Sequence, residues 1–247
     1  MRPPDPSPLR ATSVGLTHEG CVRDLNEDAV LTDDRRGLWG VADGMGGYAL
    51  GDVASATVVG HLGYVRTAWP TARSLALDLV GRLEDANTEL RALAAREGHR
   101  MIGSTVACLA VWGPYALALW CGDSRIYRLR DGRPIQRISQ DHTLVQGLVD
   151  AGHLTEAEAE SHPNAHVLTR GLGVSETFEP DFRQMSLMAG DRFILCSDGL
   201  SRVLPDIRIE AISWSARSPG LACMALLEAA LHAGGPDNVT IAVIDFS

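Results

Sequence analysis

Short apolar runs recur along the chain, and most end next to a glycine or an aspartate. They lie at residues 38–41, 104–111, 117–121, 125–129, 192–196 and 239–244. These runs are rich in Val, Ile, Leu, Trp and Tyr and are short enough to be β-strands. The pattern therefore predicts a fold built largely on sheets.

Three longer stretches between these runs predict helices. Residues 51–65 are rich in small and apolar side chains, and residues 220–233 precede the last predicted strand. Within residues 74–97, apolar side chains such as Leu75, Leu79 and Leu83 recur at helical spacing, with charged residues between them. Because the helices come in blocks rather than alternating with single strands, the order favours an α+β fold in which helices cover packed sheets.

Residues 141–173 differ in character and are interpreted as an excursion from the sheet. Residues 142–149 predict a short helix, and Thr155 predicts the N-cap of another. Because such connections often carry function, we expect this segment to form a flap over a site. The proline-rich residues 1–10 predict a disordered lead. No repeat or Gly/Ser linker divides residues 11–247, which are interpreted as one domain.

Composition adds limits on the class of protein. The chain has 247 residues, of which 45% are hydrophobic and 21% charged, as in ordinary globular proteins. No apolar run reaches the roughly 18 residues that a membrane span requires. Five widely spaced cysteines without a Cys-x-x-Cys pair predict buried thiols in a reducing compartment, so we expect a cytoplasmic protein. The net charge of −9 argues against nucleic-acid binding.

Carboxylates stand where predicted strands begin or end, and most of them lie close to a glycine. They are Glu27, Asp28, Asp43, Asp123, Asp198 and Asp237. A single Asp-Gly is most simply a turn. Carboxylates at the mouths of adjacent strands can also converge, however, and hard divalent cations require several oxygens at fixed positions. Several acidic turns that each adjoin an apolar strand therefore favour a divalent-cation site.

Six short motifs occur in a fixed order along residues 12–244. Residues 23–28 read Arg-Asp-Leu-Asn-Glu-Asp, residues 43–47 Asp-Gly-Met-Gly-Gly, and residues 103–105 Gly-Ser-Thr. Residues 122–125 read Gly-Asp-Ser-Arg, residues 197–199 Ser-Asp-Gly, and residues 237–239 Asp-Asn-Val. In this order they resemble the PPM family, the metal-dependent protein phosphatases of the protein phosphatase 2C type, in its bacterial branch. His162-Pro163 and Leu168-Thr169-Arg170 are similar to the bacterial flap region.

The resemblance implies two β-sheets packed face to face with helices outside both, an α-β-β-α sandwich. It also implies two or three bound Mn²⁺ or Mg²⁺ ions. Asp43 would bridge the two core ions, and Asp198 and Asp237 would complete the protein ligands of the first. The backbone carbonyl of Gly44 would bind the second ion.

The remaining roles also come from the resemblance. Glu27 and Asp28 would hold waters of the second ion. Asp123, together with Asp198, would bind a third ion. Arg23 would bind the substrate phosphate. Met45 stands where many eukaryotic members carry a histidine that is proposed as general acid, so no general acid is assigned.

This donor set suits hydrolysis of phosphate monoesters. A water that bridges two divalent ions yields hydroxide near neutral pH because its pKa falls by many units. The same ions, with Arg23, can offset charge on the phosphoryl oxygens. The resemblance implies a protein-serine/threonine phosphatase that reverses a bacterial Ser/Thr kinase, and we expect a monomer.

Alternatives remain open for activity and partner. A catalytically silent module could dock phosphoproteins, although such a protein should have lost metal aspartates and none is missing. The compact chain looks similar to stand-alone phosphatases that accompany kinases controlling type VI secretion. A phosphatase of cell-wall or sporulation signalling would look much the same.

Overall fold

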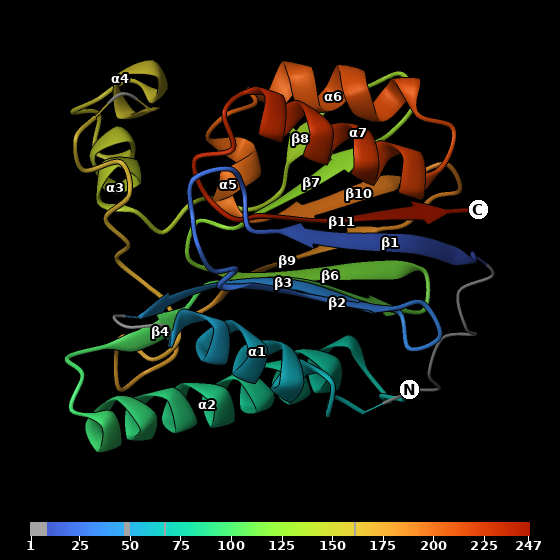
Figure 1. Cartoon of the computed structure of the whole chain (residues 1–247). Helices are drawn as coiled ribbons and strands as arrows, with labels where there is room; N and C mark the ends of the chain where they lie inside the picture. Colours follow the sequence, from blue (N-terminus) through green and yellow to red (C-terminus); the bar gives the residue numbers. More distant parts are fainter. Residues whose placement is uncertain (1–8, 47–49, 67, 161) are drawn as a thin grey trace.

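Two antiparallel sheets form the centre of the fold. The computed structural model describes residues 9–46, 50–66, 68–160 and 162–247. Within this part of the chain, a five-stranded sheet and a six-stranded sheet face each other (Figure 1). The strands of the first sheet, in spatial order, are β1 (Ala11–His18), β11 (Val239–Phe246), β10 (Arg192–Cys196), β7 (Arg125–Leu129) and β8 (Gln136–Arg137).

The second sheet lies against the first. Its strands are β2 (Asp28–Asp33), β3 (Leu38–Gly46), β5 (Val106–Trp112), β6 (Tyr115–Cys121) and β9 (Asp181–Ser186), with β4 (Ile102–Ser104) paired to β3. Every strand pair in both sheets is antiparallel. All six predicted strands are present. However, β3 extends five residues beyond its predicted end, and the predicted strand 104–111 is divided at Thr105 between β4 and β5.

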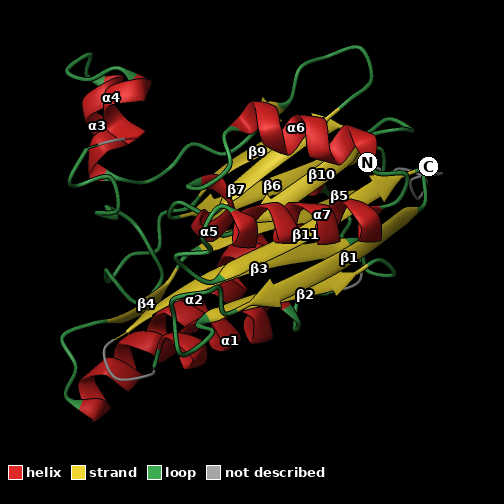
Figure 2. Ribbon diagram, turned by 45° about the horizontal axis from the view of Figure 1, so that its top comes forward, coloured by secondary structure: helices red, strands yellow, loops and turns green. Residues whose placement is uncertain are grey.

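Helices cover the outer face of each sheet. The six-stranded sheet carries α1 (Gly51–Leu62) and α2 (Ala72–Glu97), and the five-stranded sheet carries α6 (Asp206–Ser215) and α7 (Pro219–His232) (Figure 2). A short helix, α5 (Asp198–Ser201), follows β10 directly. The architecture is the α-β-β-α sandwich that the resemblance implies, so the fold prediction is confirmed.

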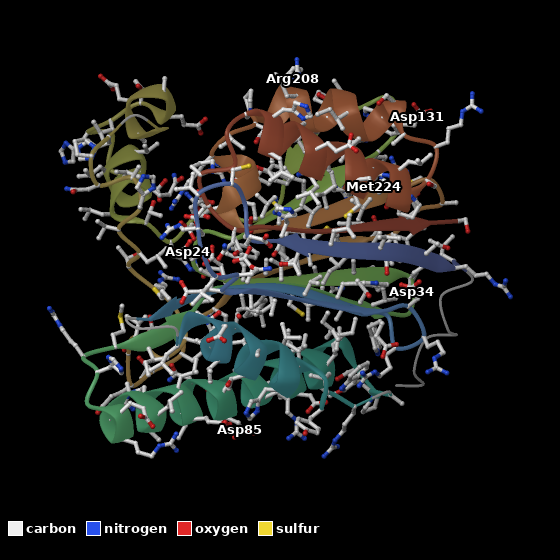
Figure 3. All side chains as sticks on the ribbon, in the orientation of Figure 1. Asp24, Asp34, Asp85, Asp131, Arg208 and Met224 are labelled. Atoms are coloured by element: carbon white, nitrogen blue, oxygen red, sulfur yellow. The ribbon has the colours of Figure 1, made fainter. Side chains whose placement is uncertain are left out.

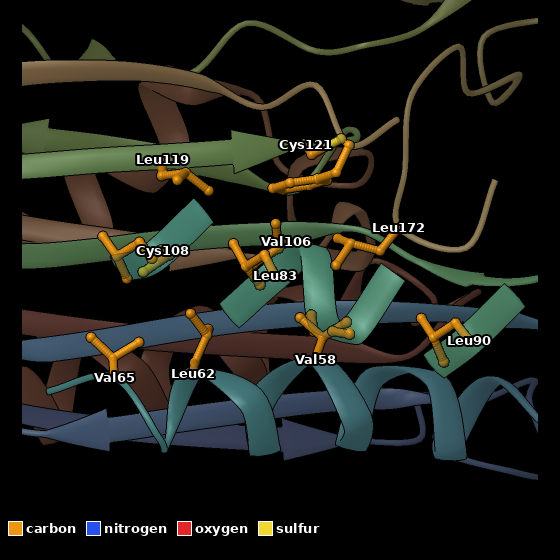
Figure 4. Packing of buried hydrophobic residues seen from close by; sticks show 14 of the residues in the cluster. Val58, Leu62, Val65, Leu83, Leu90, Val106, Cys108, Leu119, Cys121 and Leu172 are labelled. Atoms are coloured by element: carbon orange, nitrogen blue, oxygen red, sulfur yellow. The ribbon is translucent and has the colours of Figure 1, made fainter. Parts of the chain in front are cut away.

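The strands are buried on both faces because each sheet separates two apolar layers. Val106, Cys108 and Ala110 of β5 face α1 and α2, where they pack with residues such as Leu83 (Figure 4). The alternating residues Ala107 and Leu109 face the other sheet. Such two-sided burial explains why the central strands are continuous apolar runs rather than alternating ones. Burying each large side chain contributes on the order of 1.5–3 kcal/mol.

The ends of α2 follow local chemistry. The Thr71 hydroxyl accepts a hydrogen bond from Ser74 N–H at 3.1 Å, and Ser74 reaches back to the Thr71 backbone, which forms a capping box. Gly98 ends the helix at φ 70°, a conformation that glycine adopts without strain. The helix therefore begins two residues before the predicted start.

The predicted excursion leaves the sandwich and carries two helices, α3 (Leu144–Asp150) and α4 (Glu156–Glu160), which stand apart beside the sheets (Figure 1). Thr143 caps α3, since its hydroxyl accepts from Gln146 N–H at 3.2 Å. Thr155 caps the start of α4 as predicted and accepts from Glu158 N–H at 3.3 Å. The two arms of the excursion join at Leu144, whose N–H donates to Val167.

Several elements were not predicted: β1, β2, β8, β9, α5 and α6. Their residues mix polar and apolar side chains with weak periodicity, and tertiary pairing decides their structure. Residues 1–8 of the predicted lead lie outside the described residues, whereas Arg10 exchanges two backbone hydrogen bonds with Ser247. None of the described helices has the length and apolar character to cross a lipid bilayer.

Candidate metal centre

Strand ends from both sheets meet at one end of the sandwich, beside the loop that carries Asp24 in Figure 3. Asp43 lies in β3 and Asp28 faces it across the β2–β3 ladder. Asp198 begins α5, and Asp237 precedes β11. The fold thus brings together residues that are up to 209 positions apart in sequence, counted from Asp28 to Asp237.

These carboxylates line a cleft of about 270 Å³. Its walls include all the residues assigned from the resemblance except Asp28, namely Arg23, Glu27, Asp43, Gly44, Asp123, Asp198 and Asp237. Asp28 lies behind this wall, 8% exposed, and accepts a hydrogen bond from the Ser197 hydroxyl at 2.7 Å. The predicted site residues therefore gather in one place.

The cleft concentrates negative charge away from bulk water. Burial, reinforced by the neighbouring carboxylates, raises the pKa of Asp28 and of Asp123 to about 7. The pKa of Asp43 lies well above its usual value for the same reasons. The pKa of Asp198 is also raised by burial, although a hydrogen bond with Asp43 opposes this shift. Buried carboxylates of this kind are costly unless a cation accompanies them.

The donor set fits divalent cations of the Mn²⁺ or Mg²⁺ type. All its donors are oxygens, which hard divalent ions prefer. A Cβ added at Gly44 would stand 1.9 Å from the Gly51 carbonyl oxygen and 2.7 Å from that of Glu27. Glycine is therefore required where the chain passes next to Asp43.

A buried amide fixes the loop that precedes β2. Asn238, 6% exposed, donates from Nδ2 to the backbone oxygens of Glu19 and Leu25 at 2.9 and 2.8 Å. Its Oδ1 accepts from Glu27 N–H at 2.8 Å. The Glu27 carboxylate in turn accepts from Gly51 N–H at 3.1 Å. Asn238 belongs to the Asp-Asn-Val motif, which by itself predicts no role for this residue. The hydrogen bonds of its side-chain amide are visible only in the structure.

Two arginines enter the cleft. Arg23, with 54% of its side chain exposed, donates to Asp237 Oδ2 at 2.9 Å. Arg202 was missed by sequence reasoning, and it pairs with Asp123, Asp198 and Asp237. The available signal was its position four residues after Asp198, which places both on one side of a helix.

Arg202 also stands six residues after Cys196, the Cys-x5-Arg spacing of cysteine-dependent phosphatases. The structure rules out that chemistry here. Cys196 is fully buried among apolar residues of the five-stranded sheet and α7, and burial raises the pKa of its thiol to about 12. A nucleophilic cysteine needs an accessible thiolate. The Arg202 guanidinium instead contacts the carboxylates of Asp123, Asp198 and Asp237.

The flap segment contacts the cleft from one side. His142 Nδ1 accepts from Gly122 N–H at 3.2 Å, and its Nε2 lies 3.1 Å from Asp181 Oδ2. His142 therefore supports the loop that carries Asp123. His166 of the flap segment lines the cleft.

Fold and donor set together define an α-β-β-α sandwich with a candidate divalent-cation centre at one end. A protein family model, protein phosphatase 2C, matches residues 18–224. The chain therefore belongs to the protein phosphatase 2C family, and the resemblance predicted from the sequence is confirmed.

Individual relatives agree with this assignment. The serine/threonine protein phosphatase PstP of Mycobacterium tuberculosis is 40% identical over 233 residues, which cover 92% of this chain and 43% of PstP. The chain thus spans less than half of that relative. Among solved structures, PppA, described as a key regulatory component of T6SS in Pseudomonas aeruginosa, superposes with TM-score 0.88 at 37% identity, covering 96% of this chain and 98% of PppA.

A third relative bears on the ions. The catalytic domain of PstP, solved in complex with two manganese ions, superposes with TM-score 0.87 at 35% identity and covers 96% of this chain and 99% of its own. That relative is a manganese-binding member of the family.

Proposed function

We propose that this chain hydrolyses phosphoserine and phosphothreonine in proteins with the aid of two Mn²⁺ or Mg²⁺ ions. The observation that carries the proposal is the convergence of Asp43, Asp198 and Asp237 next to the obligatory Gly44. Asp43 would bridge the two ions, Asp198 and Asp237 would bind the first, and the Gly44 carbonyl would bind the second. Family membership and the relatives' phosphatase activity support it.

Bound ions supply Lewis acidity, which activates water and offsets phosphoryl charge. The residues of the chain do the rest. Glu27 and Asp28 would orient waters at the second ion. The Asn238 amide holds the Glu27 backbone, Gly51 N–H donates to the Glu27 carboxylate, and the Ser197 hydroxyl donates to the Asp28 carboxylate. Arg23 reaches the cleft from a half-exposed position and donates to phosphate oxygens.

Protonation of the leaving group is not assigned to a side chain. Met45 lines the cleft beside Gly44 and has no proton to give.

The substrates we propose are phosphoproteins made by a Ser/Thr kinase. PppA acts in type VI secretion according to its description, and we propose the same setting for this chain. Cell-wall or sporulation signalling is the alternative. A cytoplasmic location is proposed because all five cysteines are free, four of them buried.

Metal add-back tests the reaction. Metal-free protein should not hydrolyse a phosphothreonine peptide, and Mn²⁺ or Mg²⁺ should restore turnover. Asp43→Asn should lower turnover at least roughly 100-fold because it removes the bridging carboxylate. Asp131→Asn, in an exposed turn between β7 and β8 (Figure 3), is the matched control and should behave as the wild type.

Two outcomes would contradict the proposal. Equal activity of Asp43→Asn and the wild type would remove the bridging role. No turnover with either metal, combined with calorimetric binding of the phosphopeptide, would instead favour the docking module. To address the partner, Asp198→Asn can be used to capture phosphoproteins, and absence of secretion-linked proteins would count against type VI secretion.

A further inference from the structure

The short helix α5 places Arg202 beside Asp198. Asp198 is the first residue of α5 and Arg202 is its C-cap, so the two are one helical turn apart. Arg202 N–H donates to the Asp198 carbonyl at 2.9 Å. Residues at this spacing lie on the same side of a helix. The backbone therefore places a permanent positive charge next to a proposed metal ligand.

The guanidinium lies among three carboxylates. Its Nη2 pairs with Asp198 Oδ2 and lies 3.5 Å from Asp123 Oδ2, and its Nη1 lies 3.8 Å from Asp237 Oδ2. About a third of the side chain, 32%, remains exposed. The attraction of Arg202 also lowers the pKa of both Asp123 and Asp198 against the effect of burial.

Asp123 and Asp198 are the pair to which the family resemblance assigns a third ion. A divalent ion would have to approach these oxygens to about 2.0–2.6 Å. The guanidinium pairs with the Oδ2 atoms of both residues, so an ion held between these two atoms and the arginine would exclude each other. The first ion would use the oxygens of Asp198 and Asp237 that Arg202 does not contact. With Arg202 in place, the residues do not fit a third ion.

We propose that Arg202 takes the place of the third ion, so that the chain binds two divalent ions and supplies the next cation itself. This inference rests on the proposed two-ion centre.

Charge supports this arrangement. The carboxylates at the centre are Glu27, Asp28, Asp43, Asp123, Asp198 and Asp237. Two divalent ions with Arg23 and Arg202 would balance these six negative charges. A third divalent ion would leave an excess of two positive charges with Arg202 in place, and of one if Arg202 moved out. Because arginine stays protonated at any accessible pH, its contribution does not depend on metal concentration.

Removal of the arginine should open a usable site. Arg202 lines both the 270 Å³ cleft and an adjoining cavity of about 330 Å³ that extends under the flap. Asp123 and Asp198 line both spaces as well. A shorter neutral side chain would leave these two carboxylates facing accessible space, which an ion needs in order to enter.

The test counts bound metal and does not depend on activity. Metal-free protein is dialysed against a series of Mn²⁺ concentrations, and bound manganese is measured by mass spectrometry. We expect about two ions per chain for the wild type and about three for Arg202→Asn at saturation. Arg208→Asn, an exposed arginine of α6 (Figure 3), is the matched control and should bind about two. The double variant Arg202→Asn/Asp123→Asn should return to about two.

Each alternative outcome is informative. A wild type that binds three ions, or an Arg202→Asn variant that still binds two, overturns the inference and leaves the two-ion centre intact. A wild type that binds no manganese overturns the centre itself and the inference with it. Circular dichroism confirms folding of each variant, and Arg202→Gln, closer to arginine in length, repeats the count if the asparagine variant is unstable.

Discussion

Thr105, the residue between β4 and β5, forms two hydrogen bonds with Asp43. The Thr105 hydroxyl accepts from Asp43 N–H at 3.1 Å, and Thr105 N–H donates to the Asp43 carbonyl at 2.8 Å. The same hydroxyl lies 2.7 Å from the Ser124 hydroxyl, next to Asp123. One buried threonine thus connects two acidic loops of the metal centre.

Thr105→Val should destabilise the protein by about 1–3 kcal/mol, because it leaves the Asp43 N–H and the Ser124 hydroxyl without this partner in a buried site. Manganese affinity should fall as well, since the Asp43 backbone is less firmly placed. Urea unfolding and metal titration measure the two effects. Thr12→Val on the exposed face of β1 should change stability by no more than about 0.5 kcal/mol. An equally stable Thr105→Val would contradict the connecting role.

Gly44→Ala and Gly60→Ala should have opposite effects. At Gly44 the added methyl would meet the Gly51 backbone at 1.9 Å, so the loop must shift, at a cost of about 1–3 kcal/mol and with loss of metal binding. At Gly60, within α1, a Cβ meets nothing within 4 Å. Alanine there should stabilise by about 0.5–1 kcal/mol. Thermal unfolding compares the two variants, and a tolerated Gly44→Ala would show that this close packing is not required.

Arg23→Ala should lower kcat/KM about 10- to 100-fold, as expected for loss of a charge-assisted hydrogen bond to phosphate. Bound manganese should stay the same, because Asp237 retains its carboxylate. Arg35→Ala, an exposed arginine of the β2–β3 turn, serves as control. Unchanged kinetics for Arg23→Ala would remove Arg23 from substrate binding, whereas loss of metal would assign it to the ion site instead.

Metal-free protein should lose stability as the pH rises from about 4 to 7. The pKa of Asp28 and of Asp123 is about 7 in the folded state. In the unfolded chain it is near 3.9, so between about pH 4 and pH 7 the folded state binds more protons. Stability from these groups therefore falls through this window by linkage, on the order of a few kcal/mol.

Manganese should reverse this trend, because ions bind the deprotonated carboxylates and compete with protons. The increase in melting temperature on adding Mn²⁺ should accordingly be larger at pH 8 than at pH 5.5. Burial lowers the pKa of His142, which costs stability toward acid pH in both forms and cancels in the comparison. A manganese effect of equal size at both pH values would contradict the raised pKa values.

Much of the fold was predictable because its signals are local. The central strands are continuous apolar runs, and α2 carries its periodicity and its capping residues within one segment. By contrast, β1 has a mixed pattern and becomes a strand by pairing with β11, more than 220 residues away. The motif order similarly identified the acidic residues, and the structure brings them together.

The sequence alone therefore determined which acidic residues stand at the strand ends as candidate metal ligands. Strand, turn and motif signals each lie within a few neighbouring positions, so they can be recognised without the fold. Tertiary structure decided what these residues face: Asn238 holding the Glu27 loop, the burial of Cys196, and Arg202 lying between Asp123 and Asp198. The physical reason is that burial and charge pairing depend on contacts between distant segments, which exist only once the two sheets have packed together.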